Sequence, residues 1–355
     1  MKDPQRKNTR RIYLGQVPIG DGAPVSIQSM LSVPTSDIDA CVKQLKELDA
    51  AGCDIIRVSV TSEQDAAAIA ILKRHTAMPI VADIHFDYKL ALAALQNGVD
   101  GLRLNPGNIG GRKEVESVVR AASERDIPIR IGVNSGSLPK DLLEAQGVCP
   151  ASMVEAALRH VRILEELNYY NIKISVKASR LPLMVESYRL LSSKVDYPLH
   201  LGITEAGSLT RGTIKSAMAL AILLREGIGD TIRVSLTAPP VQEVLVAREI
   251  LKGLEQKAGL NVISCPTCGR TKVKLFELVE QVEKALEPYE NLPLTVAVMG
   301  CAVNGPGEAR EADYGIAGGD GEGLLFAKGE IVKKVPEARL VHELLELIKA
   351  GVGLD

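Results

Sequence analysis

The chain has 355 residues and a formal net charge of −2, with 46% hydrophobic and 24% charged residues. This balance is typical of a soluble globular protein of one or two domains and excludes a disordered chain. With no Trp, 3% aromatic residues and a pI of about 6.3, the chain lacks the basic surface and the stacking side chains of a nucleic-acid-binding protein. The longest apolar run, residues 217–224, is too short to span a membrane, and residues 1–13 lack the apolar core of a secretory signal. We therefore expect a cytoplasmic protein with no nucleic-acid or membrane partner.

A short apolar strand, a polar loop and an amphipathic helix alternate eight times between Val25 and Lys257. Eight such units predict an α/β fold with a (β/α)8 TIM barrel, because a doubly wound sheet usually has fewer strands and a glycine-rich nucleotide turn after the first. No such turn follows the first strand, and residues 14–24, rich in Gly and Pro, predict a hairpin that closes the barrel floor. The expected strands are residues 25–29, 54–60, 79–84, 101–104, 127–133, 171–176, 198–203 and 231–236. The barrel domain is therefore expected to comprise residues 1–257.

Polar side chains gather where these strands end. The catalytic face of a barrel lies at the C-terminal ends of its strands, and side chains two residues apart share one side of a strand. Five cations are expected to converge there, with only Asp83 and Glu205 to offset them. Such a set is costly unless an anion binds, so we expect a ligand with several negative charges, and a diphosphate fits best. For any single cation the alternative is a strand-end ion pair with a neighbouring helix. The five cations are Arg57, Arg103, Arg130, Lys177 and Arg233.

Three further groups at the strand ends are candidates for chemistry. Asp83 and His85 can form an acid/base or orienting pair, and Glu205 can donate a proton near the bound anion. A lone His is more often a hydrogen-bonded core residue, and this alternative applies to His85. The glycine-rich run 105–113 can present backbone N–H groups to a phosphate, although a flexible barrel loop would look similar. His200 is expected to pack inside its strand, and no role is assigned to three helical histidines, His75, His160 and His342.

Three cysteines near the C-terminus predict a metal centre in a smaller α/β domain, residues 258–355. Residues 260–264 and 294–298 are expected strands on either side of a helix over residues 273–286. A crossover of this length makes the strands parallel, so Cys265 and Cys301, each just past a strand end, should lie at the same edge. Cys268 ends the Cys-Pro-Thr-Cys motif that begins at Cys265. Strands over 314–316, 323–327 and 330–335 and a helix over 336–350 are expected to complete the domain.

The metal and its fourth ligand stay open on these residues alone. Three thiolates suit an iron–sulfur cluster or a zinc ion, whereas a thioredoxin-type dithiol and unrelated buried cysteines are the alternatives. Glu308 follows a Gly-Pro-Gly turn seven residues after Cys301 and is the first candidate for the fourth ligand, with Glu311 and Asp313 as rivals. A carboxylate ligand would exchange more readily and so leave a corner at which a substrate oxygen can bind. The other cysteines, Cys41, Cys53 and Cys149, lie far upstream, and the spacing does not suggest a disulfide framework.

Chain direction predicts a head-to-tail homodimer. The eighth strand ends at the catalytic mouth, and the helix expected over residues 239–257 must return the chain to the barrel floor. Only residues 258–260 join that helix to the next strand, too few to carry Cys265 back to the mouth of its own barrel. We therefore expect each cluster domain to serve the partner's barrel, the alternative being a large hinge motion within one chain.

Taken together, these motifs resemble those of the hydroxymethylbutenyl diphosphate synthases, iron–sulfur enzymes of the non-mevalonate isoprenoid pathway. The resemblance runs from about Ile12 to the C-terminus without the extra internal domain of plant-type members. It implies a [4Fe–4S] cluster on Cys265, Cys268, Cys301 and Glu308. It also implies that Asn134 and Glu205 lie near the reacting carbons and that the five strand-end cations, together with Ser235, bind the diphosphate. The motifs include Asp83-Ile-His85, Arg103-Leu-Asn105-Pro-Gly-Asn, Arg130-Ile-Gly-Val-Asn134, Ser175-Val-Lys177, Thr204-Glu205-Ala-Gly, Arg233-Val-Ser235, Cys265-Pro-Thr-Cys268 and Gly-Cys301-Ala-Val-Asn-Gly-Pro-Gly-Glu308; the implied anion ligands are Arg57, Arg103, Arg130, Lys177, Arg233 and Ser235.

The implied reaction opens 2-C-methyl-D-erythritol 2,4-cyclodiphosphate by two-electron reductive dehydration to 4-hydroxy-3-methylbut-2-enyl diphosphate. No nucleotide-binding signature is present, so flavodoxin or ferredoxin is the expected electron donor. Two other classes compete: a non-redox phosphate-handling barrel with a structural zinc domain, and an iron–sulfur electron carrier fused to an anion-binding barrel. A radical S-adenosylmethionine enzyme is disfavoured because the chain has no Cys-x-x-x-Cys-x-x-Cys loop.

Overall fold

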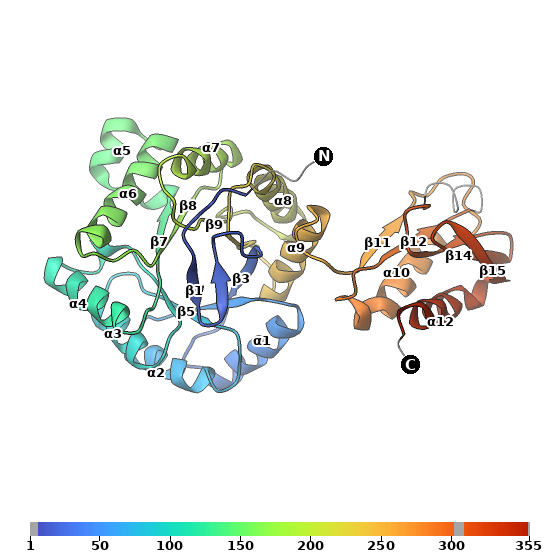
Figure 1. Cartoon of the computed structure of the whole chain (residues 1–355), viewed down its shortest axis with the longest axis horizontal. Coiled ribbons are helices and arrows are strands. Elements are labelled where there is room, and N and C mark those ends of the chain that lie inside the picture. Colours follow the sequence, from blue (N-terminus) through green and yellow to red (C-terminus); the bar gives the residue numbers. More distant parts are fainter. Residues whose placement is uncertain (1–5, 302–308, 354–355) are drawn as a thin grey trace. The chain divides into compact units, whose positions relative to one another are not determined.

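The computed structural model describes residues 6–301 and 309–353, which form two compact units. The first unit is Met1–Gln256 and the second is Lys257–Asp355, a division one residue before the predicted boundary. Figure 1 shows the first unit as strands ringed by helices and the second as a sheet with helices packed against it. Each unit has its own apolar core. Within the described ranges, no helix combines the length and the apolar character needed to cross a bilayer.

The first unit confirms the predicted (β/α)8 barrel. Its strands pair in parallel in the order β8-β7-β6-β5-β4-β3-β10-β9, and a bridge between Ile174 and Leu199 joins β8 to the segment that leads into β9. Inward-facing side chains of neighbouring strands therefore form rings, as the parallel register requires. The strands are β3 Ser26–Met30, β4 Ile55–Ser59, β5 Ile80–Asp83, β6 Gly101–Arg103, β7 Ile129–Asn134, β8 Ile172–Lys177, β9 His200–Leu201 and β10 Thr231–Ile232.

The last two strands are shorter than predicted. Arg233 N–H still donates to the Leu201 carbonyl at 3.0 Å, but Leu236 N–H donates at 3.0 Å to the Glu243 carboxylate of a helix. Because the Leu236 N–H is bound to this carboxylate, it cannot take part in hydrogen bonds between strands, and β10 ends earlier than predicted. The residues beyond β10 consequently form a loop that turns toward the helix that follows.

Nine helices of the described barrel cover the outside of the strands. Short polar side chains cap several of them: Asp37 accepts from Ala40 N–H at 3.2 Å and Ser62 from Asp65 N–H at 3.1 Å. Gly98 follows the third helix with φ +80°, a conformation that a side chain would strain. The helices are α1 Ile38–Ala50, α2 Glu63–Leu72, α3 Tyr88–Gln96, α4 Arg112–Ser123, α5 Lys140–Gln146, α6 Pro150–Glu166, α7 Leu181–Ser192, α8 Leu209–Arg225 and α9 Pro240–Gly253.

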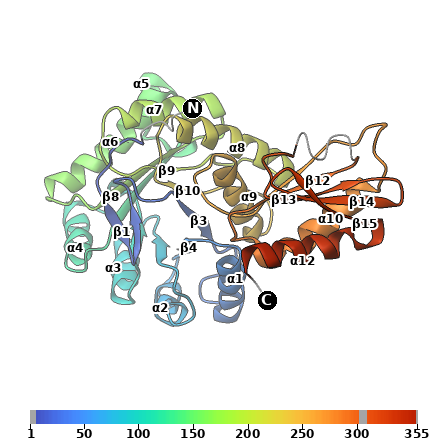
Figure 2. The ribbon, with the colours of Figure 1, turned by 45° about the vertical axis from the view of Figure 1, so that its right-hand side comes forward.

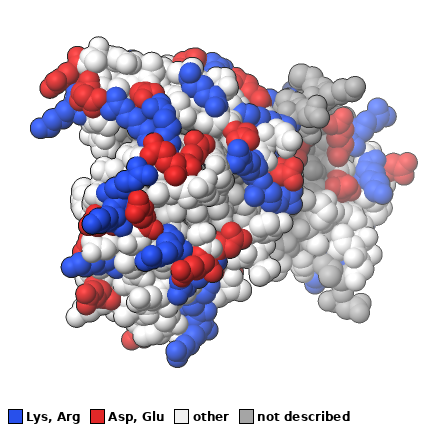
Figure 3. Space-filling view, turned by 60° about the vertical axis from the view of Figure 1, so that its left-hand side comes forward, with Lys and Arg blue, Asp and Glu red and all other residues white. Residues whose placement is uncertain are grey.

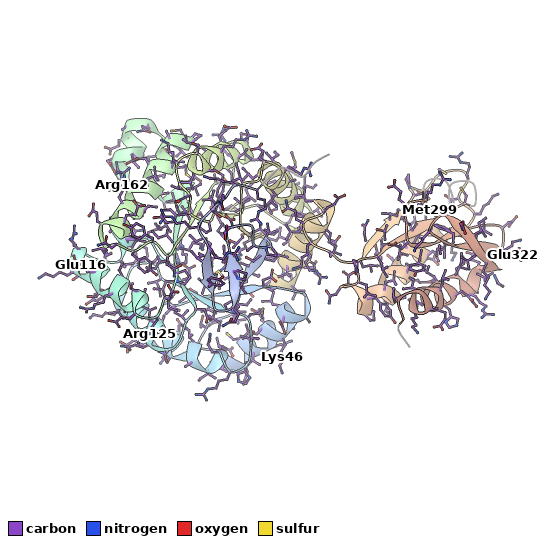
Figure 4. The ribbon with its side chains drawn as sticks, in the orientation of Figure 1. Lys46, Glu116, Arg125, Arg162, Met299 and Glu322 are labelled. Carbon is purple, nitrogen blue, oxygen red and sulfur yellow. The ribbon has the colours of Figure 1, made fainter. Side chains whose placement is uncertain are left out.

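On the barrel exterior, charges of both signs are interleaved. Figure 3 shows Lys and Arg side chains beside Asp and Glu side chains over one face of the molecule. Arg112 pairs with Glu116 and Glu166 at 3.0 and 3.3 Å, and Arg162 pairs with Glu155 at 2.9 Å. Figure 4 shows Glu116 and Arg162 at the periphery of the barrel unit. Surface pairs of this kind contribute little to stability, and they leave the exterior without a charged patch on this face.

The structure also has a hairpin near the predicted place, over residues 12–19 and not 14–24. β1 Ile12–Leu14 and β2 Val17–Ile19 pair antiparallel, and their apolar side chains pack with Ile55 and Val81 at the N-terminal ends of the barrel strands. A Cβ built on Gly101 would lie 2.3 Å from Leu14 Cδ2, so glycine at this strand start makes room for the hairpin. The floor of the barrel is therefore closed by apolar packing.

The second unit is a five-stranded sheet in the order β11-β12-β13-β14-β15. β11, β12 and β13 are parallel, which confirms the predicted β-α-β arrangement, while β14 and β15 return antiparallel. Both long helices pack on one face of the sheet through the apolar core, as Figure 2 shows. The first of them, α10, begins at Leu275, two residues later than predicted, because Val273 packs against Gly318 instead of joining the helix. The elements are β11 Asn261–Ser264, α10 Leu275–Leu286, β12 Thr295–Met299, β13 Tyr314–Gly318, β14 Glu322–Ala327, β15 Glu330–Pro336 and α12 Leu340–Val352.

Candidate functional site

The predicted strand-end cations do converge inside the barrel. The side chain of Arg57 on β4 is 13% exposed, and that of Arg103 on β6 is 10% exposed. Arg130 on β7 and Lys177 on β8 are buried more deeply, at 4% and 7%. Their strands are neighbours in the barrel, with Arg103 opposite Arg130 in the β6–β7 register. Period-two alternation and parallel pairing thus bring four cations from four strands into one interior region.

Asp83, at the end of β5, is the carboxylate at the centre of this region. It accepts a hydrogen bond from Arg103 Nη1 at 3.0 Å and lies 3.5 Å from Arg57 Nε. Burial opposes ionisation of Asp83, but the contact with His85 and the charges of Arg57, Arg103 and Arg130 hold its pKa well below the usual range. Asp83 is therefore a permanent anion that orients two arginines.

Arg130 and Lys177 are the cations of this region with the fewest hydrogen-bond and ion-pair partners. Arg130 Nη1 donates to Ser175 Oγ at 3.0 Å, while its Nε and Nη2 have no partner. Lys177 Nζ makes no hydrogen bond or ion pair with any residue in the described ranges. Burial, and then repulsion from the neighbouring arginines, lowers the pKa of both groups well below their ordinary values. An anion bound among them would oppose that lowering.

Two glycines on the inward side of the strands make room for these cations. A Cβ on Gly132 would lie 2.8 Å from Arg103 Nε, and one on Gly202 would lie 2.7 Å from Lys177 Nζ. The backbone of Gly132 is also fixed, because it donates to Asn105 Oδ1 at 2.9 Å and accepts from Asn105 Nδ2 at 3.0 Å. Asn105 thus ties the ends of β6 and β7 together. Sequence reasoning did not identify these glycines, although their inward register position was a usable signal.

Arg233 corrects the prediction that only Asp83 and Glu205 offset the cations. Its Nε and Nη2 lie 3.2 to 3.4 Å from the carboxylate of Glu243 on α9, which is 5% exposed. Glu243 Oε2 also accepts from Ser29 Oγ at 3.2 Å. The strand-to-helix ion pair that was the alternative for any single arginine therefore holds for this one. Its partner lies on a helix whose inner face is set by tertiary packing, so strand periodicity did not reveal it.

The candidate acid/base groups lie nearer to solvent. The His85 side chain is 53% exposed with Nε2 3.6 Å from Asp83 Oδ1, so its interpretation as a core histidine is wrong. Glu205 is exposed and has φ +54°, a left-handed conformation that is uncommon for a residue with a side chain. Asn134 and Ser235 are half-buried at the ends of β7 and of the segment after β10. Asn134 follows Arg130 along β7, and Ser235 follows Arg233 after β10.

The glycine-rich run 105–113 is partly occupied by internal hydrogen bonds. Gly107 N–H donates to His160 Nδ1 of α6 at 3.2 Å, and Asn108 N–H donates to the Asn105 carbonyl at 2.8 Å. Burial, followed by the charge of Arg159, lowers the pKa of His160 to about 4, so the imidazole is neutral and can accept this hydrogen bond. The prediction that this run offers its backbone N–H groups to a phosphate is therefore wrong for Gly107 and Asn108. His160 instead holds the loop that carries Asn105.

A second polar layer lies deeper in the barrel and was missed. Lys173, two positions before Ser175 on β8, is 2% exposed with no partner for Nζ, and Gln28 on β3 is 2% exposed with no partner for its amide. His200 Nδ1 lies 2.6 Å from Thr231 Oγ1. Burial, then the charge of Lys177, lowers the pKa of His200 well below the ordinary value, so His200 is a neutral packing residue, as predicted. In sequence, Lys173 is indistinguishable from a solvent-facing strand lysine.

In the second unit, the cysteines follow neighbouring parallel strands. Cys265 follows β11 and its Sγ accepts from Gly300 N–H at 3.2 Å, next to Cys301 after β12. Cys268 is exposed, and hydrogen bonds from Arg270 lower the pKa of its thiol. Glu308 lies outside the described residues. Within residues 6–301 and 309–353, no three His, Cys, Asp or Glu side chains are close enough to hold a metal ion.

Two family models together match most of the chain. The model described as the GcpE TIM-barrel domain matches residues 9–248, and that described as the GcpE protein C-terminal domain matches residues 261–350. The matched ranges correspond to the two units of the structure. The interval between them contains the end of α9 and the link to β11.

Curated proteins with closely similar sequences share one name, 4-hydroxy-3-methylbut-2-en-1-yl diphosphate synthase (flavodoxin). The protein from Geobacter sulfurreducens is 59% identical over 342 residues, 96% of this chain and 97% of its own length. That from Thermodesulfovibrio yellowstonii is 56% identical over 348 residues, 97% of this chain and 99% of its own. Among solved structures, a dihydropteroate synthase from Xanthomonas albilineans aligns with TM-score 0.51 and 12% identity, over 69% of this chain and 97% of its own. That likeness shows the barrel fold alone.

Proposed function

Since the chain belongs to the GcpE family, as its motifs predicted, we propose that it catalyses the reaction named by its relatives. The substrate is 2-C-methyl-D-erythritol 2,4-cyclodiphosphate and the product is 4-hydroxy-3-methylbut-2-enyl diphosphate. Counted on the neutral acids, the reaction consumes two electrons and two protons and releases one water. The ring C–O bond to phosphate breaks, a hydroxyl leaves as water, and a carbon–carbon double bond forms. The enzyme must therefore bind a diphosphate, supply a proton and deliver electrons.

The observation that carries this proposal is the open cationic charge at the strand ends. Five cations face three carboxylates, Asp83, Glu243 and Glu205, so the described mouth has two positive charges in excess when all are ionised. A cyclic diphosphate carries two negative charges. The free N–H groups of Arg130 and Arg103 and the ammonium of Lys177 are the donors that such an anion needs.

The five cations divide by role. Lys177 and Arg130 bind the anion most directly, because the barrel leaves their donors open. Asp83 orients Arg57 and Arg103, and Glu243 orients Arg233, so these three present their remaining N–H groups in fixed positions. Ser235, two residues after Arg233, adds a hydroxyl at the rim. With its pKa held so low, Asp83 acts by orienting neighbours and not as an acid.

Glu205 is the proton donor in this scheme. It is exposed at the mouth, and the left-handed backbone at this residue aims its side chain differently from that of a regular strand. In the same scheme Asn134, at the end of β7, hydrogen-bonds the substrate near its reacting carbons. His85 stands beside Asp83 with its ring half exposed, where it can hold a substrate oxygen or pass a proton.

The donor set of the second unit fits an iron–sulfur cluster. Three thiols lie on loops after adjacent parallel strands. Cys265 Sγ accepts a backbone N–H, and hydrogen bonds from Arg270 lower the pKa of Cys268. We propose that Cys265, Cys268, Cys301 and Glu308 hold a [4Fe–4S] cluster. Such a cluster supplies electrons one at a time and, at its carboxylate corner, a Lewis acid for an oxygen ligand. The names of the relatives support flavodoxin as the electron donor, and ferredoxin is the alternative.

We propose a head-to-tail homodimer because of the path that the chain takes after the barrel mouth. Glu243 of α9 lies beside Arg233 at the mouth, whereas Arg248 further along donates at 2.9 Å to Ala51, after the end of α1 near the floor. Residues 254–256 then turn back on the helix, with Gln256 N–H donating to Leu251. The 14 residues of α9 descend about 21 Å, whereas residues 257–260 span at most about 14 Å. A cluster that serves this mouth is therefore best supplied by a partner chain.

The experiment for the cluster is anaerobic purification with iron and sulfide analysis and a visible spectrum, on the wild type and on Glu308→Ala. We expect about four irons and four sulfides per chain in the wild type. The variant should keep three thiolate ligands, with an altered spectrum and little turnover. Zinc without sulfide in the wild type would refute the cluster. A variant with an unchanged spectrum and full activity would show that another group is the fourth ligand.

A further inference from the structure

The segment that follows Cys268 carries a row of exposed cations ending in an exposed aromatic ring. Arg270, Lys272 and Lys274 are exposed at alternate positions, and Phe276, two residues further, is 75% exposed. These four residues are called the basic strip below. A phenylalanine so exposed at the end of a row of cations is typical of a protein-binding surface.

The intervening residues hold the basic strip in place. Thr271 N–H donates to the Cys268 carbonyl at 3.0 Å, and its Oγ1 accepts from Cys268 N–H at 3.2 Å. Val273 packs at Gly318, where a Cβ would lie 2.6 Å from it, and Leu275 is 4% exposed in the core. Because the odd-numbered positions are anchored inward, the even-numbered side chains are presented outward together.

The charge of the basic strip is only partly compensated. Lys274 lies 3.2 Å from Glu277, but Arg270 and Lys272 make no ion pair in the part of the chain that the structure describes. On the far edge of the same sheet the cations are neutralised: Lys333 pairs with Glu343 at 2.6 Å, and Lys334 pairs with Glu322. Positive charge is therefore left open beside the cysteines, whereas at the far edge of the sheet it is paired.

The basic strip is also adjacent to the loops that carry the thiols. Lys272 N–H donates to the Gly300 carbonyl at 2.9 Å, and Gly300 directly precedes Cys301. Arg270 lies two residues after Cys268 in the same loop. A protein that bound the basic strip would therefore lie against the loops at which electrons must enter.

We propose that the basic strip is the docking surface for an acidic electron-donor protein of the flavodoxin type. This inference rests on the proposed function, because only a redox role for the cysteines requires such a partner. Open cations beside the entry point attract an acidic partner and raise its association rate, and the effect weakens with salt. The ring of Phe276 supplies the apolar contact that positions the partner once it has arrived.

The test compares Lys272→Glu with Lys284→Glu in the full-length, cluster-loaded protein. Lys284 is an exposed lysine of α10 away from the basic strip, so both variants change the net charge equally. Binding of oxidised flavodoxin is measured by calorimetry at about 0.02 and 0.3 M salt. Lys272→Glu should weaken binding at least roughly tenfold at low salt and flatten the salt dependence, whereas Lys284→Glu should stay within about twofold of the wild type. Phe276→Ser should weaken binding at both salt concentrations.

Turnover with a chemical reductant separates this proposal from the proposed function. All three variants should retain the wild-type rate with dithionite and viologen, and Lys272→Glu and Phe276→Ser should lose rate only with flavodoxin. Equal flavodoxin affinity in Lys272→Glu and Lys284→Glu would overturn the docking surface. So would a loss of self-association in Lys272→Glu by sedimentation with flavodoxin binding intact, because the basic strip would then contact a second copy of the chain. A wild type that binds flavodoxin but cannot turn over the cyclic diphosphate with either reductant would instead refute the proposed function.

Discussion

Arg130 and Lys177 are two buried cations that the described part of the barrel leaves without a counter-ion. Both are buried to within a few per cent, and neither has a carboxylate partner within hydrogen-bonding distance among the described residues. Burial alone would select against such residues, since an uncompensated buried charge costs several kcal/mol. The proposed anion therefore best explains their presence on the neighbouring strands β7 and β8.

This account predicts that Arg130→Ala or Lys177→Ala lowers kcat/KM for the cyclic diphosphate at least roughly tenfold. Each charge-assisted hydrogen bond to the diphosphate should contribute about 1.5–3 kcal/mol to the transition state relative to free substrate. Arg162→Ala is the control, because Arg162 pairs with Glu155 on the outside of the barrel. Iron content should be unchanged in all three variants. Normal kinetics in both barrel variants would mean that the anion binds elsewhere.

Glu205→Gln should keep substrate binding and lose kcat. The amide preserves the size of the side chain but cannot donate a proton from a carboxylic acid, so the chemical step slows while the cations still hold the diphosphate. The measurement is steady-state kinetics together with the substrate Kd of the variant. A kcat equal to that of the wild type would exclude Glu205 as the donor.

At the scale of elements, α6 supports the site through a single imidazole. His160 accepts from Gly107 N–H, and a Cβ on Gly107 would lie 2.9 Å from the ring, so the loop and the helix fit only with glycine at this position. The folded pKa of His160 is lowered to about 4, against about 6.5 in the unfolded chain. The unfolded state therefore binds more protons between these two values. The stability that this neutral imidazole confers is complete above pH 6.5 and is lost as the pH falls toward 4.

The expected result is a difference in the pH dependence of barrel unfolding between the wild type and His160→Gln. From pH 7 to pH 5 the wild type should lose roughly 1–2 kcal/mol more than this variant, whose amide oxygen can still accept from Gly107. His75→Gln, on an exposed histidine of the same unit, should behave like the wild type. Denaturant titrations at the two pH values measure the difference. Parallel curves for the wild type and His160→Gln would show that His160 is not the titrating group.

Strand periodicity predicted the elements and the convergence of the cations because both follow from local pattern and parallel register. Arg57, Arg103, Arg130 and Lys177 could be assigned to one interior from sequence alone. Glu243, His160 and Lys173 could not, since each owes its role to which helix face or strand position packs inward. The lengths of β9 and β10 were overestimated for a related reason: the Glu243 carboxylate takes a backbone donor that local sequence assigns to the strand.

At the scale of the whole molecule, the two units supply different parts of one reaction. In the proposed function, the barrel holds the anion and the proton donor, while the three cysteines lie in the second unit. The short link after α9 motivates the proposal that these parts meet between chains. Mixing an inactive barrel variant, Arg130→Ala with Glu205→Gln, with an inactive cluster variant, Cys301→Ser, should therefore restore part of the activity. Some mixed dimers would pair an intact barrel with an intact cluster.

The mixing experiment needs evidence of subunit exchange, for example from differently tagged chains that co-purify. Each variant mixed with itself is the control and should stay inactive. Demonstrated exchange without any recovery of activity would show that one chain completes its own active site through motion of the link.

The most direct test of the central claim is turnover of 2-C-methyl-D-erythritol 2,4-cyclodiphosphate by the anaerobically purified protein with a chemical reductant, followed by phosphorus NMR. The account predicts that the signals of the cyclic diphosphate give way to those of a linear diphosphate monoester, with two electrons consumed per molecule. An iron–sulfur-loaded protein that leaves the cyclic diphosphate intact would contradict it.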